Sequence, residues 1–239
     1  MRNRLYKLWN TCLRMIYPQT CYFCGEISRV AICPVCQKKI VYIKEPRCKR
    51  CGKPIRYAEN EFCVDCKREK IFYEQGKSIW LHKEPVSWSV YQFKYHNRRV
   101  FGEFYASEMW RLYGEKIRDW EIDTIIPVPL HWKRRVSRGY NQAEILAKHL
   151  GRYSGILVQT KGIKRIRYTE RQKKLGNKER KKNLAGAFTI SKKWKKVRNV
   201  LIIDDIYTTG NTINEMAGIL KQNGVEKVFF LTISIGQGF

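Results

Sequence analysis

Two carboxylates and a hydroxyl-rich turn follow an apolar stretch near the C-terminal end of the chain. Val200–Ile203 run directly into Asp204 and Asp205. An uninterrupted apolar run predicts a strand buried on both faces, as in a parallel sheet. The next turn offers backbone N–H groups and hydroxyls ahead of a helical pattern, which together suit a phosphate. Acids beside that turn could bind two sugar hydroxyls, so the stretch predicts a sugar-phosphate site, with Mg²⁺ as its companion. The turn consists of Thr208, Thr209, Gly210, Asn211 and Thr212.

This stretch resembles the phosphoribosyl pyrophosphate (PRPP) loop of type I phosphoribosyltransferases. The resemblance implies that Asp204 and Asp205 hold the ribose hydroxyls, as the catalytic acidic pair, and that Thr208–Thr212 hold the 5′-phosphate. Two plainer interpretations are a buried strand that ends in a solvated acidic pair, and an acidic pocket of the response-regulator kind. Neither requires the hydroxyls and the glycine in this register, so we favour the phosphosugar site.

Cysteines form a second chemical pattern, confined to the first part of the chain. Eight of the nine cysteines form Cys-x-x-Cys pairs, a spacing that lets two thiolates bind one ion from a tight turn. Four such knuckles predict two structural Zn²⁺ sites without catalysis, most simply from the first two knuckles and the last two, although interleaved pairing stays open. A disulfide framework is the alternative. The pairs are Cys21 and Cys24, Cys33 and Cys36, Cys48 and Cys51, and Cys63 and Cys66.

The charge balance limits the classes of partner. The sequence has 48 basic and 21 acidic residues, a net charge of +27, and 44% hydrophobic residues, enough for a proper core. Such an excess of positive charge favours nucleic acid, an anionic membrane surface or a phosphorylated ligand. We predict no transmembrane segment. Residues 1–17 have apolar residues at helical spacing, which predicts an amphipathic helix that docks on its own protein or lies on a membrane surface.

The segments between these two patterns must position them. We expect a linker at Lys67–Lys70, a strand at Ser87–Tyr95 and an amphipathic helix at Arg99–Lys116. Asp123–Leu130 predicts a second buried strand that prolines end, and Gln142–Leu150 a helix. Between these two lies a basic loop, which we interpret as a pyrophosphate site rather than an ordinary solvated loop. Its basic residues are Lys133, Arg134, Arg135 and Arg138.

Three further stretches narrow the resemblance to the ComF (ComFC) family. They are Pro127–Leu130, Arg138–Gln142 and a basic loop in which Arg167, Thr169, Gln172 and Arg180 match the family's flexible loop. The resemblance implies a zinc ribbon joined to a phosphoribosyltransferase-type domain, and a role in DNA uptake during natural transformation or in handling single-stranded DNA. It implies single-stranded DNA, PRPP and DNA-uptake proteins as partners. It also implies a cytoplasmic location, with peripheral membrane association as the alternative.

We therefore predict an α/β fold, a type I phosphoribosyltransferase-like parallel sheet flanked by helices, with a small N-terminal zinc ribbon. The expected domains are the helix at 1–17, a double zinc ribbon at 18–70 and the main domain at 71–239. Two other hypotheses stay open beside the competence role. One is an active phosphoribosyltransferase with an unknown acceptor, and the other is a zinc-stabilised adaptor between proteins.

Overall fold

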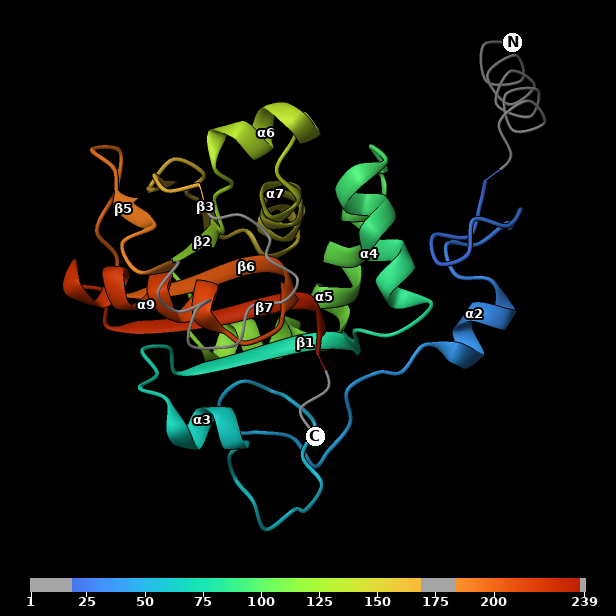
Figure 1. Cartoon of the computed structure of the whole chain (residues 1–239), viewed down its shortest axis with the longest axis horizontal. Coiled ribbons are helices and arrows are strands. Elements are labelled where there is room, and N and C mark those ends of the chain that lie inside the picture. Colours follow the sequence, from blue (N-terminus) through green and yellow to red (C-terminus); the bar gives the residue numbers. More distant parts are fainter. Residues whose placement is uncertain (1–18, 169–183, 237–239) are drawn as a thin grey trace.

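A parallel sheet forms the centre of the molecule in the computed structural model, which describes residues 19–168 and 184–236 (Figure 1). All four strand pairs in this five-stranded sheet are parallel, which confirms the α/β class. The expected helix at 1–17 lies outside the described residues. From edge to edge the strands are β3 (Leu157–Val158), β2 (Thr124–Pro127), β6 (Asn199–Tyr207), β7 (Lys227–Ile235) and β1 (Gln75–Leu81).

Helices cover both faces of the sheet. Successive side chains of a strand point to opposite faces, so Leu201 and Ile203 of β6 join one core cluster while Val200 and Ile202 join the other. The first cluster includes α5 (Phe101–Asp119) and α7 (Gln142–Ser154), and the second includes α9 (Asn211–Gln222). Burial on both faces explains why the central strands are continuously apolar.

The cysteine-rich segment packs against the sheet instead of standing apart from it. Its first half contains α2 (Pro34–Lys39) and its second half α3 (Val64–Arg68). The stretch between them runs beside β1, where the N–H of Leu81 donates to Val41 and the N–H of Ile43 donates to Ile79. Farther along β1, the N–H of Gly76 donates to the carbonyl of Arg50 at 2.7 Å. The outer edge of β1 is therefore covered by the ribbon.

Two glycines permit this close approach. A Cβ on Gly52 would lie 2.8 Å from the carbonyl oxygen of Gly76, and a Cβ on Gly76 would lie 1.9 Å from the ring of Phe230. The ribbon turn thus lies directly against the backbone of β1, and the Phe230 ring of β7 lies over Gly76. A side chain at Gly52 would push the ribbon away from the sheet, and one at Gly76 would displace the Phe230 ring.

The segment before α5 corrects one prediction. Ser87–Tyr95, expected as a strand, lies in the helix α4 (Val86–Tyr95). Its buried residues recur at helical spacing, and two of them, Ser89 and Lys94, are polar. The expected basic loop also contains a short helix, α6 (Trp132–Arg138). Among the described residues, no helix is long and apolar enough to cross a membrane.

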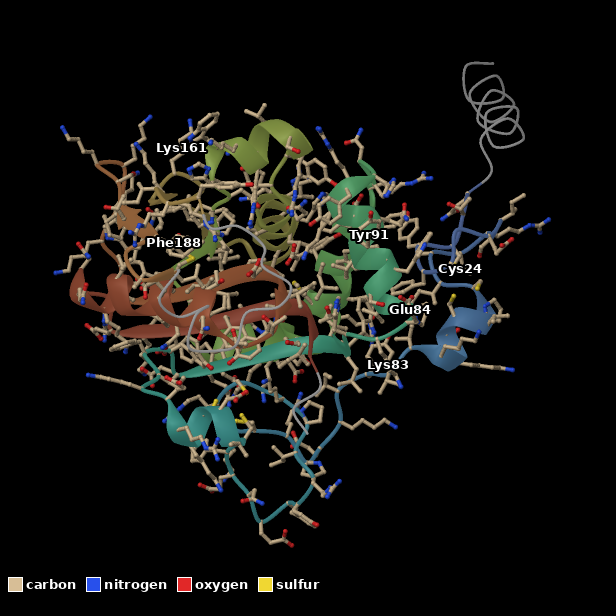
Figure 2. The ribbon with its side chains drawn as sticks, viewed as in Figure 1. Cys24, Lys83, Glu84, Tyr91, Lys161 and Phe188 are labelled. Atoms are coloured by element: carbon tan, nitrogen blue, oxygen red, sulfur yellow. The ribbon has the colours of Figure 1, made fainter. Side chains whose placement is uncertain are left out.

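A small antiparallel sheet adjoins the main one. It pairs β4 (Ile163–Arg165) with β5 (Phe188–Ile190), on either side of residues 169–183. A Phe188 side chain from β5 packs in the cluster that also contains α9 (Figure 2). This sheet therefore holds the two ends of the expected flexible loop beside the main domain.

Candidate functional site

The sheet topology marks one crevice. From β2 the chain continues outward to β3, whereas from β6 it continues in the opposite direction to β7. The strand order therefore reverses between β2 and β6, whose residues pair as far as Pro127 and Ile203. Ligands of open α/β sheets bind outside the carboxyl ends of the strands at such a reversal. The stretch predicted to bind a phosphosugar follows β6 at this point.

The turn between β6 and α9 forms a shallow pocket lined by Asp204 and Thr208–Thr212. Gly210 precedes α9 with φ of 78°, in the left-handed region that glycine tolerates best. No side chain caps this helix start, as is also the case for α3, α4 and α5. The first N–H groups of a helix have no intrahelical partner. The pocket therefore has unsatisfied donors that suit an anion.

Two buried tyrosines pack beneath this turn. A Cβ on Gly210 would lie 2.3 Å from the hydroxyl of Tyr207, whose ring stacks on Phe230 at 4.9 Å. The Tyr207 hydroxyl lies 2.8 Å from that of Tyr73, which lies 3.9 Å from the Sγ of Cys66. Burial raises the pKa of both phenols, so both remain protonated. A chain of contacts thus joins the second cysteine group to the turn.

The two acids at the end of β6 have different surroundings. The Nζ of Lys94 lies 2.9 Å from the Asp205 carboxylate, and these side chains are only 7% and 12% exposed. Asp204 has no ion-pair partner among the described residues; burial, followed by the charge of Asp205, raises its pKa to about 7. Asp204 is therefore the acid available to a ligand, while Asp205 is bound to α4. The sequence analysis did not select Lys94, because it placed this residue on a strand.

The four basic residues between β2 and α7 do not act as one group. Arg135 pairs with Glu144 at 3.3 Å. Arg138 donates hydrogen bonds to Gln142 and to the hydroxyl of Tyr95, both at 3.0 Å.

Lys133 and Arg134 instead lie over the ring of Tyr168, at 5.4 and 5.7 Å. The charge of Arg134 is close enough to Arg165 to lower the pKa of that guanidinium, which burial lowers most, to about 10. The structure therefore divides the predicted pyrophosphate residues between two surroundings.

The expected flexible loop is described only at its ends. The guanidinium of Arg167 donates to the carbonyl of Ala185 at 2.8 Å, which holds the two ends together. Thr169, Gln172 and Arg180 lie outside the described residues. Arg165, which the sequence analysis did not select, is partly buried near Asp204 and acts on its pKa. Because Arg165 lies on a short strand beside a basic loop, its sequence context did not indicate a role at this site.

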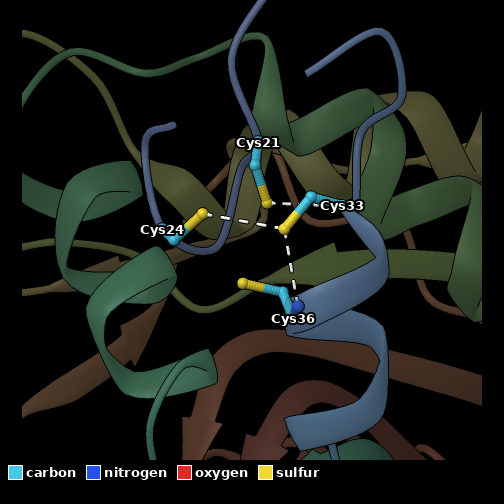
Figure 3. Close-up of side chains that lie close together, drawn as sticks. All are labelled: Cys21, Cys24, Cys33 and Cys36. Carbon is cyan, nitrogen blue, oxygen red and sulfur yellow. Dashed lines mark hydrogen bonds between the residues drawn. The ribbon is translucent and has the colours of Figure 1, made fainter. Parts of the chain in front are cut away.

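The eight paired cysteines form two tetrads, each from consecutive knuckles as in the simpler prediction. Tetrahedral zinc with Zn–S bonds of about 2.3 Å separates its sulfur atoms by about 3.8 Å. The Sγ atoms of Cys24 and Cys33 lie 3.8 Å apart, and those of Cys51 and Cys63 lie 3.6 Å apart. In the first tetrad the side chains converge on one point (Figure 3). Both tetrads therefore fit structural zinc, which would hold the ribbon folded through four thiolates each.

Comparison with known proteins finds two domain families along the chain. A double zinc ribbon domain matches residues 12–67, and a phosphoribosyl transferase domain matches residues 108–234. The chain is 32% identical over 208 residues to "Competence protein F" of Haemophilus influenzae, and the match covers 85% of this chain and 90% of that protein. It is 28% identical over 217 residues to "DNA utilization protein YhgH" of Salmonella typhimurium (88% and 94%) and 25% identical over 202 residues to "Competence protein ComFC" of Bacillus subtilis (81% and 79%).

Proposed function

Since the chain belongs to the ComF family, in which a double zinc ribbon precedes a phosphoribosyltransferase domain, we propose that it is a competence protein that takes part in DNA uptake. In this proposal it handles single-stranded DNA in the cytoplasm during natural transformation, together with proteins of the uptake machinery. The names of its relatives, which refer to competence and DNA utilization, support the role. The pocket between β6 and α9 binds PRPP or a similar phosphosugar.

One observation carries the phosphosugar assignment: α9 begins without a side-chain cap directly beside Asp204. A 5′-phosphate would accept hydrogen bonds from the first N–H groups of α9 and from the hydroxyls of Thr208, Thr209 and Thr212. It would take the place of the missing cap. The glycine at 210 keeps the turn free of a side chain, so the phosphate can approach the backbone.

The remaining groups have separate tasks in this proposal. The Asp204 carboxylate accepts hydrogen bonds from the ribose hydroxyls, and the Lys94–Asp205 ion pair fixes the strand end that carries it. Lys133, Arg134 and Arg165 attract the pyrophosphate, and Mg²⁺ bound with it would neutralise part of its charge. Arg135 and Arg138 have other partners, so we do not assign them to the pyrophosphate.

Phosphoribosyl transfer is a second candidate, favoured by an acid at the pocket, Asp204, on which the charge of Arg165 acts. Displacement at C1 of PRPP would break the bond to pyrophosphate and form a bond to the acceptor. Pyrophosphate would then be released only when an acceptor nucleophile is present. A pyrophosphate-release assay with and without nucleobases therefore separates an enzyme from a protein that only binds the phosphosugar.

The binding proposal is tested by thermal unfolding with PRPP and Mg²⁺. A ligand at about 100 times its Kd stabilises the folded state by about 2.7 kcal/mol. We expect this stabilisation in the wild type and its loss in Asp204→Asn. Asp119→Asn is the matched control, because Asp119 is an exposed acid on α5 with a weak partner at 3.4 Å. Equal stabilisation of all three proteins would show that PRPP binds elsewhere.

The DNA proposal is tested separately with labelled oligonucleotides. Single strands should bind more tightly than the duplex of the same sequence, and the affinity should fall steeply with salt because counterions are released. If the protein binds neither the single strands nor the duplex, this part of the proposal is wrong, whereas the proposal for the phosphosugar pocket is unaffected.

A further inference from the structure

The helix α6 buries none of its seven residues. Trp132 is 63% exposed and Val136 is 76% exposed. Residues four positions apart share one face of a helix, so these two form an apolar strip on the outside of the molecule. Three arginines and a lysine make up most of the remaining sequence of α6. An exposed tryptophan on a basic helix without core contacts is a feature that packing does not explain.

The end of α4 continues this surface. The guanidinium of Arg138 lies over the Tyr95 ring at 4.7 Å and joins α6 to α4. The Tyr95 ring lies 5.0 Å from that of Tyr91, which is 5.3 Å from the ring of His96. Tyr91, which Figure 2 labels on α4, is 52% exposed, and Tyr95 is 40% exposed. Planar groups thus follow one another from α4 to α6, with faces accessible from outside.

Positive charge lies between and beside these rings. Arg98 and Arg99 follow α4, and the Arg99 guanidinium lies over the Tyr140 ring at 4.8 Å. Unpaired bases stack on aromatic rings and guanidinium planes, while cations hold the phosphates between them. A duplex conceals the faces of its bases and would gain only the charge contacts. A membrane surface would favour an apolar face separate from a basic one, such as the Trp132–Val136 strip of α6, whereas at α4 the Tyr95 ring lies against the Arg138 guanidinium.

We propose that this α4–α6 surface (Tyr91, Tyr95, Trp132 and Arg138) is the site at which single-stranded DNA binds. Bases stack on Tyr91 and Trp132, and Arg98 and Arg138 hold phosphates. The proposal rests on the proposed function, which supplies the class of ligand, and adds its location. It also gives Arg138 a role apart from the phosphosugar pocket, while Lys133 and Arg134 at the start of α6 remain near Tyr168.

The test measures binding of a labelled oligothymidylate by fluorescence anisotropy. We expect Tyr91→Ala and Trp132→Ala each to weaken binding by about 5- to 100-fold, as found for the loss of one stacked base. Tyr91→Phe keeps the ring and should bind as the wild type does. Tyr57→Ala is the matched control, because Tyr57 is an exposed aromatic residue of the ribbon, 58% exposed, away from this surface. Thermal unfolding with PRPP should be unchanged in all four variants.

The outcomes separate the two proposals. A wild type that binds no single strand removes the proposed DNA function and this inference with it. A wild type that binds, with Tyr91→Ala and Trp132→Ala no weaker than Tyr57→Ala, retains the function but overturns the location. Equal losses for single strands and duplex would show that the surface contacts only the phosphate backbone, and would overturn stacking. If Tyr91→Ala and Trp132→Ala weaken binding to anionic vesicles but not to DNA, the surface binds membranes, and this result also overturns the inference.

Discussion

The ion pair between Lys94 and Asp205 offers a direct test of how the site is built. Replacing Lys94 by methionine keeps the aliphatic stem and removes the ammonium group. At 2.9 Å, two unit charges attract by about 6 kcal/mol at an effective dielectric constant of about 20. Burying the ions offsets part of this, and removal of one partner from a buried pair costs about 3–5 kcal/mol. We expect a loss of that size in the free energy of unfolding.

The assay is urea unfolding of the zinc-loaded protein, followed by tryptophan fluorescence. In thermal unfolding the same loss corresponds to a decrease in Tm of about 6–20 °C for a chain of this size. The double variant Lys94→Met with Asp205→Asn should recover most of the stability, since no charge is then left buried alone. Lys116→Met is the matched control, because the Lys116–Asp119 pair is separated by 3.4 Å and its side chains are 43% and 62% exposed.

An exposed pair of this kind contributes about 0–1 kcal/mol. Equal costs for Lys94→Met and Lys116→Met would refute the reasoning, because they would mean that the Asp205 carboxylate finds water when its partner is removed. No recovery in the double variant would refute it as well. In that case the methionine itself, and not the unpaired charge, would disturb the end of α4.

Three further predictions concern the pocket and the ribbon. The pKa of Asp204 is raised from 3.8 to about 7, so the folded state keeps this proton to a higher pH than the unfolded state does. The free energy of unfolding therefore falls as pH rises from about 4 to about 7. Asp204→Asn should be more stable than the wild type in urea unfolding at pH 8, and the difference should shrink towards pH 4. Gly210→Ala should cost more than about 1–2 kcal/mol and lose the PRPP-induced thermal shift, because its Cβ would meet a hydroxyl at 2.3 Å, whereas Gly155→Ala, with φ of 74° and open space around it, should show only the backbone cost. Cys51→Ser and Cys24→Ser should each reduce the zinc measured by mass spectrometry from two ions per chain to one, and Cys51→Ser should lower Tm more, since its tetrad is wholly buried against the sheet while Cys24 is exposed.

Much of the fold could be predicted because local patterns and tertiary roles agree there. The apolar run before Asp204 fits only a strand buried on both faces, and the glycine and hydroxyls after it fit only a tight turn into a helix. The cysteine spacing similarly left few arrangements, and the simpler pairing is the one observed. In these segments each residue type has one dominant physical reason for its position.

The prediction failed where polar residues occupy the core. In α4 the buried positions include Ser89 and Lys94, whereas Tyr91 and Tyr95 are exposed. A reader of apolar periodicity therefore places the aromatic residues inside and finds a strand. The buried lysine is explained only by Asp205, which lies more than a hundred positions later in the chain. A long-range charge partner of this kind leaves no local signal, so the helix and its role at the site were both missed.

The pairing of the ribbon with β1 has a consequence for self-association. A strand at the margin of a sheet presents open N–H and C=O groups that can recruit another chain. Here the residues around Val41 and Arg50 occupy that margin, in hydrogen bonds to Leu81 and Gly76. The ribbon thus occupies this edge and prevents self-association through it. A chain reduced to its phosphoribosyltransferase domain would expose the unpaired N–H and C=O groups of β1, and we expect it to form insoluble aggregates.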